Sequence, residues 1–122
     1  MANILIADDA SFMRSSLKFI VESAGHVVVG LAKSGNEAVE MFEKHRPDIV
    51  TLDILMNGGD GISALRQIMK LDPGARVIMI SAMGHEEKQK EAKVLGAAGF
   101  IRKPFKAEDI VAEIERIGSH RV

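Results

Sequence analysis

The sequence predicts an α/β fold in which five helices cover both faces of a five-stranded parallel sheet. Five short aliphatic runs alternate along the chain with five segments whose apolar residues recur at helical spacing. The aliphatic runs are continuous, which is typical of strands that are buried on both faces. They lie at residues 4–6, 27–29, 49–52, 77–80 and 99–101. A strand followed by a helix, five times over, favours a parallel sheet.

The first two helices are each marked by a start or stop signal. Apolar residues around Leu17 lie on one helical face, and Gly25 then provides a stop. Ser34 and Glu37 have the spacing of a capping box at the start of the second helix. Pro47 ends that helix, because the residue before a proline disfavours helical backbone angles.

The other three helices differ in how clearly their ends are marked. Asp60 can cap the third helix, and the turn at residues 72–74 closes it. The fourth, at about residues 85–95, is mostly charged, so we expect it to be the least buried. Its charged face is either simply solvated or a docking site for a partner. The fifth carries apolar residues around Ile114, but its expected cap position, Lys106, is a poor capping residue.

Composition limits the classes of function. The 122 residues suffice for one domain, residues 1–122, with its own core. Sixteen Lys and Arg against 17 Asp and Glu give a net charge of -1, which disfavours binding to nucleic acid or to an anionic membrane. The absence of cysteine excludes disulfides and thiolate metal sites. No apolar stretch approaches the ~20 residues of a membrane helix and no signal peptide is recognisable, so we expect a cytoplasmic protein.

Polar residues follow four of the predicted strands. Asp8 and Asp9 come after the first, Asp53 after the third, Ser81 after the fourth and Lys103 after the fifth. The carboxyl ends of parallel strands share one edge of the sheet, where ligands gather, so we expect these side chains to meet. Three ionised carboxylates repel one another by ~1 to 4 kcal/mol per pair, so either a cation or a proton must be present. An all-oxygen ligand set suits Mg²⁺ better than a soft metal.

These motifs resemble the receiver domain of two-component response regulators over essentially the whole chain. The resemblance is carried by Asp8-Asp9, by Asp53 within LDILM, by Ser81-Ala82 and by Lys103-Pro104-Phe105, while DDASFMR and SAMG are similar to the chemotaxis (CheY-like) branch. It implies the flavodoxin-like strand order 2-1-3-4-5 and a cis bond between Lys103 and Pro104. The spacing alone does not predict either feature.

The resemblance also implies a metal site and a phosphoacceptor. Asp53 would accept a phosphoryl group from a histidine kinase. Asp9 and Asp53 would bind Mg²⁺ directly, Asp8 would bind it partly through water, and the backbone carbonyl of Leu55 would complete the protein ligands. The side chain of Leu55 is apolar, whereas relatives can carry a polar group there that places the attacking water, so we expect a long-lived phosphoryl group.

Three further residues receive roles from the resemblance. Lys103 would neutralise charge on the phosphoryl group, and the Ser81 hydroxyl would bind another phosphoryl oxygen. Phe100 would then swing inward into the space that Ser81 releases. Phosphorylation of Asp53 would in this way bias a two-state element and change the affinity for a partner.

The protein expected from this resemblance is a phosphoacceptor switch, which phosphorylates and dephosphorylates itself but is not otherwise an enzyme. Its partners would be the histidine kinase and a downstream protein, for which a flagellar switch protein is one candidate, and a separate phosphatase is another possible partner. We expect a monomer in chemotaxis signalling that binds neither nucleic acid nor membrane.

Three alternatives stay open at this point. The chain could be the receiver of a longer regulator, such as a methylesterase or a transcription factor. A Mg²⁺-dependent phosphatase of the haloacid-dehalogenase type would also use an Asp nucleophile, but it requires an Asp where this chain has Leu55. A flavodoxin-like FMN carrier has the same fold, but Asp8 and Asp9 would repel the FMN phosphate.

Overall fold

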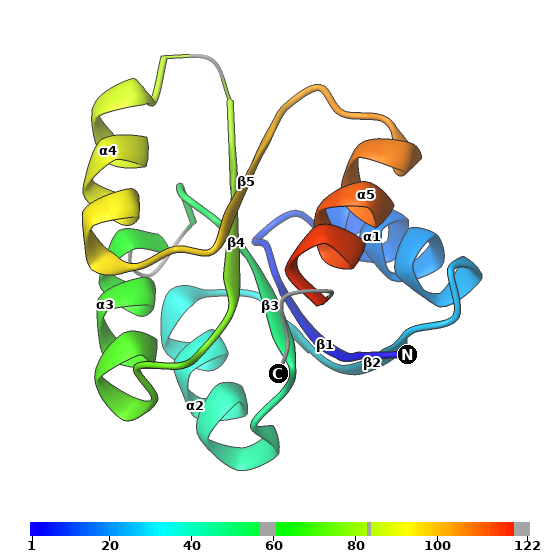
Figure 1. The fold of residues 1–122 in the computed structure, drawn as a ribbon, viewed down its shortest axis with the longest axis horizontal. Coiled ribbons are helices and arrows are strands. Elements are labelled where there is room, and N and C mark those ends of the chain that lie inside the picture. The colour runs from blue at the N-terminus through cyan, green and yellow to red at the C-terminus, as the bar shows by residue number, and fades with distance from the viewer. Residues whose placement is uncertain (57–60, 83, 119–122) are drawn as a thin grey trace.

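The computed structural model describes residues 1–56, 61–82 and 84–118. They form a five-stranded sheet, parallel throughout, in the order β2-β1-β3-β4-β5 (Figure 1). The predicted α/β class and the order 2-1-3-4-5 are therefore confirmed. Among the described helices, none combines the length and the apolar character needed to cross a bilayer.

The ten elements alternate as predicted. The strands are β1 (Asn3–Ala7), β2 (Val27–Ala32), β3 (Ile49–Asp53), β4 (Val77–Ser81) and β5 (Gly99–Arg102). The helices are α1 (Ser11–Ser23), α2 (Gly35–His45), α3 (Gly61–Leu71), α4 (Glu86–Leu95) and α5 (Ala107–Gly118).

Two apolar cores lie on opposite faces of the sheet. Helices α2, α3 and α4 cover the face that carries Leu5 and Met79, while α1 and α5 cover the face that carries Ile4 and Ile80 (Figure 1). Successive strand residues point to opposite faces, so a strand covered on both sides must be apolar throughout. The prediction of two-sided burial holds for β3 and β4 but is wrong for β2, in which Val27 is 43% exposed. The reason is that β2 forms an edge of the sheet.

Acidic side chains help to define the starts of α2 and α5. The Glu37 N–H donates to Ser34 Oγ at 3.1 Å, as the capping box predicts. The Glu37 carboxylate accepts from the N–H of Lys33, one residue before the expected partner. At α5 the Lys106 N–H donates to Asp109 Oδ2 at 2.9 Å. An acid in the first turn thus satisfies the backbone where Lys106 offers no capping oxygen.

The start of α3 packs directly against the end of β3. The Gly61 N–H donates to the Ile54 carbonyl at 2.6 Å. A Cβ atom at Gly61 would overlap the carbonyl oxygen of Asp53 and come within 3.0 Å of Ile54 Cα. Only glycine allows this approach, which fixes the backbone that carries Asp53. The predicted cap Asp60 lies outside the described residues.

We expect Gly61→Ala to lower the free energy of unfolding by about 1 to 3 kcal/mol, because the added methyl group meets rigid backbone rather than a movable side chain. Urea unfolding followed by circular dichroism measures this difference. Gly118→Ala is the matched control, since no atom lies within 4 Å of a Cβ built there. Equal stability of the two variants would contradict the proposed close packing.

Candidate functional site

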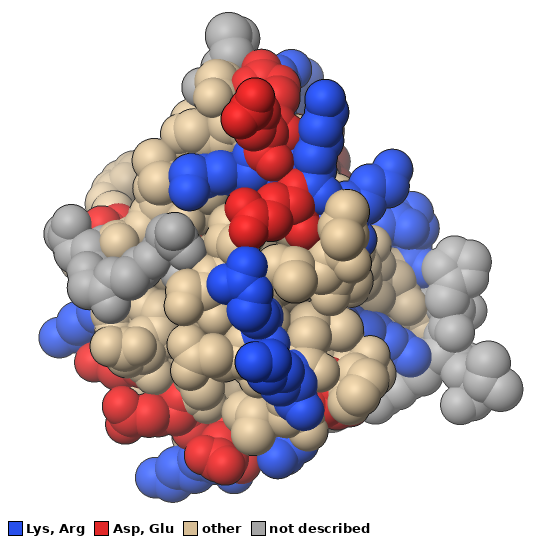
Figure 2. Space-filling model, turned by 90° about the vertical axis from the view of Figure 1, so that its left-hand side faces the viewer, with Lys and Arg blue, Asp and Glu red and all other residues tan. Residues whose placement is uncertain are grey.

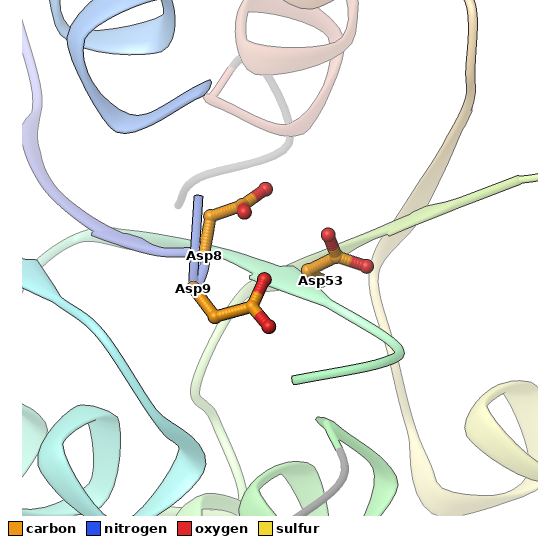
Figure 3. Close-up of side chains that lie close together, drawn as sticks. All are labelled: Asp8, Asp9 and Asp53. Atoms are coloured by element: carbon orange, nitrogen blue, oxygen red, sulfur yellow. The ribbon is translucent and has the colours of Figure 1, made fainter. Parts of the chain in front are cut away.

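Three carboxylates meet at the carboxyl edge of the sheet. Asp8 and Asp9 follow β1, and Asp53 is the last residue of the neighbouring β3. Figure 3 shows the three side chains turned toward a common space, and one oxygen of each lies within 4.8 Å of the others. Asp8 and Asp53 are buried, at 1% and 6% exposure, whereas Asp9 is exposed. The structure therefore brings together the acids that the sequence predicted to meet.

Lys103 supplies positive charge at this cluster. Its Nζ donates to Asp53 Oδ2 at 2.7 Å and lies 3.8 Å from Asp8 Oδ2. The peptide bond between Lys103 and Pro104 is cis, as expected from the resemblance. Burial alone would lower the pKa of Lys103, but the hydrogen bond and charge of Asp53, with further contributions from Asp8 and Asp9, raise it overall. Lys103 is thus a permanent cation in this site at neutral pH.

Asp8 is the acid whose charge is least well compensated. Its Oδ1 accepts from the Ala10 N–H at 2.9 Å, but its buried Oδ2 has no hydrogen-bond partner within the part of the chain that the structure describes. Burial is the main cause that raises the pKa of Asp8 to about 6; the Ala10 N–H opposes this shift and the charge of Asp53 adds to it. The Lys103 ammonium, 3.8 Å from Asp8 Oδ2, therefore compensates only part of the cost of burying this carboxylate.

This set of groups fits a hard divalent cation. Three clustered carboxylates, one of them with a buried oxygen that no described residue hydrogen-bonds, offer oxygen ligands and negative charge in excess of Lys103. The Leu55 N–H donates to Asp53 Oδ1 at 3.2 Å, and the Leu55 side chain points outward with the residue 47% exposed. The predicted use of the Leu55 carbonyl as a ligand stays a prediction.

Ser81 lies beside the acids but is bonded to a residue that sequence reasoning missed. Ser81 ends β4, is 1% exposed, and its Oγ accepts a hydrogen bond of 2.6 Å from Gln89 Nε2 on α4. Gln89 stands three residues before Ala92, the buried residue of α4, and so lies on the same helical face. The spacing of three residues places Gln89 on the inner face of α4, but only once Ala92 is known to face the core.

Phe100 is partly buried in the middle of β5, and its backbone is held from α5. The Phe100 N–H donates to Glu113 Oε2 at 3.0 Å. A hydrogen bond from Arg116 is the main cause that keeps the pKa of Glu113 low, so the acceptor stays ionised. Arg116 also donates to the Ala98 carbonyl at 3.0 Å. These contacts fix the backbone on both sides of the Phe100 ring.

Arg14 is a second residue that the sequence did not reveal. Its Nη1 donates to the Asp8 carbonyl at 2.8 Å, and the Asp8 N–H donates to the Ala32 carbonyl at 3.0 Å. The backbone of the acidic turn is thus held from α1 and from β2. No local sequence signal marks Arg14, because its partner is a backbone atom.

Comparison with known proteins points to one family. Residues 4–115 match the family described as "Response regulator receiver domain". Chemotaxis protein CheY of Thermotoga maritima is 46% identical over 114 residues, which cover 93% of this chain and 95% of that protein. A protein-glutamate methylesterase/protein-glutamine glutaminase of Pyrococcus abyssi is 48% identical over 104 residues, 83% of this chain but 28% of that protein. A solved CheX-CheY-BeF3-Mg complex from Borrelia burgdorferi is similar with a TM-score of 0.91 and 41% identity, over 95% of this chain and 88% of that chain.

We expect Asp8 to make the cation-free protein less stable as the pH rises from about 4 to 7. Its folded-state pKa of about 6 exceeds the ordinary value of 3.8, so the folded state holds the proton more tightly, and this stabilisation is lost as the pH rises through 6. Asp8→Asn does not titrate at this position. The free energy of unfolding of the wild type should therefore fall by roughly 2 kcal/mol relative to the variant across this window.

Urea unfolding in EDTA at several pH values measures this difference. A difference that stays constant from about pH 4 to 7 would contradict the raised pKa. Saturating Mg²⁺ should abolish most of the pH dependence, because a bound cation stabilises the ionised carboxylate.

Proposed function

The chain belongs to the family of response regulator receiver domains, and from this membership we propose that it is a phosphoacceptor switch in which Asp53 takes a phosphoryl group from a histidine kinase. One observation carries the proposal most directly. The Lys103 ammonium lies 2.7 Å from Asp53 Oδ2 inside a cluster of three carboxylates. A nucleophilic carboxylate, a fixed cation and a set of metal ligands are the parts that phosphoryl transfer requires.

In the proposed reaction, a carboxylate oxygen of Asp53 attacks the phosphorus of a phosphohistidine. The new bond joins Asp53 to phosphorus, and the bond from phosphorus to the histidine nitrogen breaks, with its electron pair remaining on that nitrogen. Lys103 moves from Asp53 Oδ2 to a phosphoryl oxygen and stabilises the charge there. Mg²⁺ held by Asp8, Asp9 and Asp53, with the Leu55 carbonyl, would neutralise further phosphoryl charge.

Access for the phosphodonor is supported by a hollow of about 630 Å³ beside Lys103. Phe12, which is 79% exposed, and Phe105 are among the residues that line it, together with Ala82. The small side chain of Ala82 leaves this approach open. An incoming imidazole with its phosphoryl group would have apolar walls on one side and the Lys103 ammonium on the other.

The response to phosphorylation would pass through Ser81 and Phe100. The Ser81 hydroxyl would bind a phosphoryl oxygen, and the Phe100 ring would move inward. This change would alter the affinity for a downstream protein. The similarity to chemotaxis proteins CheY favours a role in chemotaxis with a flagellar switch protein as the partner and a separate phosphatase as the off-signal.

Two of the alternatives can be weighed against the site. The methylesterase relative, of which this chain covers 28%, keeps open the idea that the receiver works within a longer regulator. A phosphatase of the haloacid-dehalogenase type is disfavoured, because Leu55 stands where such an enzyme needs its acid. The cytoplasmic location and the monomeric state stay predictions.

The test is intact-mass measurement after incubation with acetyl phosphate, with and without Mg²⁺. The wild type should gain one phosphoryl group only with Mg²⁺, Asp53→Asn should gain none, and Asp72→Asn, at a turn on the opposite edge of the sheet, should behave as the wild type. A wild type that gains no Mg²⁺-dependent adduct, or an Asp53→Asn variant that still gains one, would refute the proposal.

The apolar side chain at position 55 should prolong the life of the phosphorylated state. We expect Leu55→Asn to shorten the lifetime of the Asp53 phosphoryl group by about 2- to 10-fold, because one added hydrogen bond can orient the attacking water. The decay of the adduct mass after removal of acetyl phosphate measures this lifetime. The control is Leu71→Asn. Leu71 is exposed at the end of α3, which leads to the amino end of β4, whereas Asp53 lies at the carboxyl end of β3. An unchanged or longer lifetime in Leu55→Asn would contradict the prediction.

A further inference from the structure

We infer that Gln89 is a positioning residue that couples the hydroxyl of Ser81 to helix α4. The inference rests on the proposed function, because it concerns how a phosphoryl group on Asp53 acts on the rest of the molecule. Its basis is the hydrogen bond of 2.6 Å from Gln89 Nε2 to Ser81 Oγ. Ser81 is 1% exposed and Gln89 is partly buried, so the Ser81 end of this bond is shielded from water.

Among the described residues, helix α4 has few buried contacts besides this hydrogen bond. Ala92 is its buried residue, which agrees with the prediction that this helix is the least buried. Two ion pairs of α4 within the described residues, Arg66 with Glu91 at 3.0 Å and Arg102 with Glu86 at 3.7 Å, join side chains that are each at least 45% exposed. Exposed ion pairs contribute about 0 to 1 kcal/mol. The partly buried hydrogen bond from Gln89 to the end of β4 is therefore a further constraint on where this helix lies.

The chemistry of a hydroxyl allows both contacts at once. Ser81 has one O–H donor and two acceptor lone pairs. The Gln89 amide N–H occupies a lone pair, so the O–H stays available for a phosphoryl oxygen on Asp53. A chain of donors from Gln89 through Ser81 to the phosphoryl group is mutually polarising, which strengthens each bond. When Ser81 turns toward Asp53, it draws the Gln89 side chain with it.

The consequence reaches the outer surface of α4. Gln89 lines a groove of about 410 Å³ between α4 and β5, together with Phe100, Glu86, Lys90 and Lys93. Figure 2 shows the side of the molecule that carries α4, where acidic and basic side chains lie close together. A displaced Gln89 side chain opens space beside Phe100 and changes this groove. The same hydrogen bond thus connects the phosphoryl site with a surface on which a partner can act.

The test compares ¹H–¹⁵N spectra of α4 amides before and after addition of beryllium fluoride and Mg²⁺, for proteins first checked for an Mg²⁺-dependent acetyl phosphate adduct at Asp53. Gln89→Leu removes the donor and keeps the bulk of the side chain. We expect it to reduce the shift changes of α4 amides about fivefold, the lower end of typical couplings between sites. Gln67→Leu is the matched control, because Gln67 is exposed on α3 and, within the described residues, its side chain bonds to Ser63 on the same helix.

A double substitution separates positioning from a general effect on folding. In a Ser81→Ala background, Gln89→Leu should cause no further loss of the α4 response, because the bond is already absent. Gln89→Glu places an acceptor against the hydroxyl and should hold Ser81 away from the phosphoryl oxygen, so the α4 response should fall here too.

The same experiments distinguish a failure of the proposed function from a failure of the role of Gln89. A wild type that forms no adduct refutes the proposed function itself. An adduct that forms normally while α4 responds equally in the wild type and Gln89→Leu, or while the two substitutions act additively, overturns the role of Gln89 and leaves the proposed function intact.

Discussion

The crowding of three carboxylates around one ammonium is the constraint on which the rest of this structure depends. Asp8, Asp9 and Asp53 place more negative charge at the sheet edge than Lys103 balances, and none of the described residues donates a hydrogen bond to the buried Oδ2 of Asp8. Such a site is costly when empty and favourable when it holds a cation and a charged ligand. A cation or charged ligand that binds at this edge can therefore change the structure elsewhere in the molecule.

The fold keeps these groups together by backbone contacts as much as by side chains. Strands β1 and β3 are neighbours, so their terminal acids meet, while Lys103 reaches across from β5. Gly61 lets α3 start against the carbonyl of Asp53, and Arg14 holds the carbonyl of Asp8. These contacts limit how far Asp8 and Asp53 can move apart, so a bound cation or a proton on Asp8 must relieve their repulsion.

Strand β5 and helix α4 differ in how firmly the rest of the structure holds them. Strand β5 is clamped from α5 through Glu113, which binds the Phe100 N–H, and Gly99 leaves the room that the Glu113 carboxylate needs. Helix α4 buries Ala92 and is held to the site through Gln89. Helix α4 buries little of its surface and is hydrogen-bonded through Gln89 to Ser81 at the carboxyl edge of the sheet. It is therefore suited to shift when the charge at that edge changes. For the proposed switch, this difference predicts that α4 shifts while the backbone of β5 stays in place.

Much of the fold and of the site follows from the sequence alone. Periodicity depends on residues near one another in the chain, so it predicted the five strands, the five helices and the α/β class. Because parallel strands end at one edge of the sheet, the sequence also predicted that four side chains meet there: Asp8, Asp9, Asp53 and Lys103. Resemblance added the strand order. Only the tertiary structure decided the exposure of β2, which depends on its place at the edge, and the contacts of Gln89. Such contacts depend on how α4 is rotated against the sheet, and its mostly charged sequence offers no clear apolar face from which to predict that rotation.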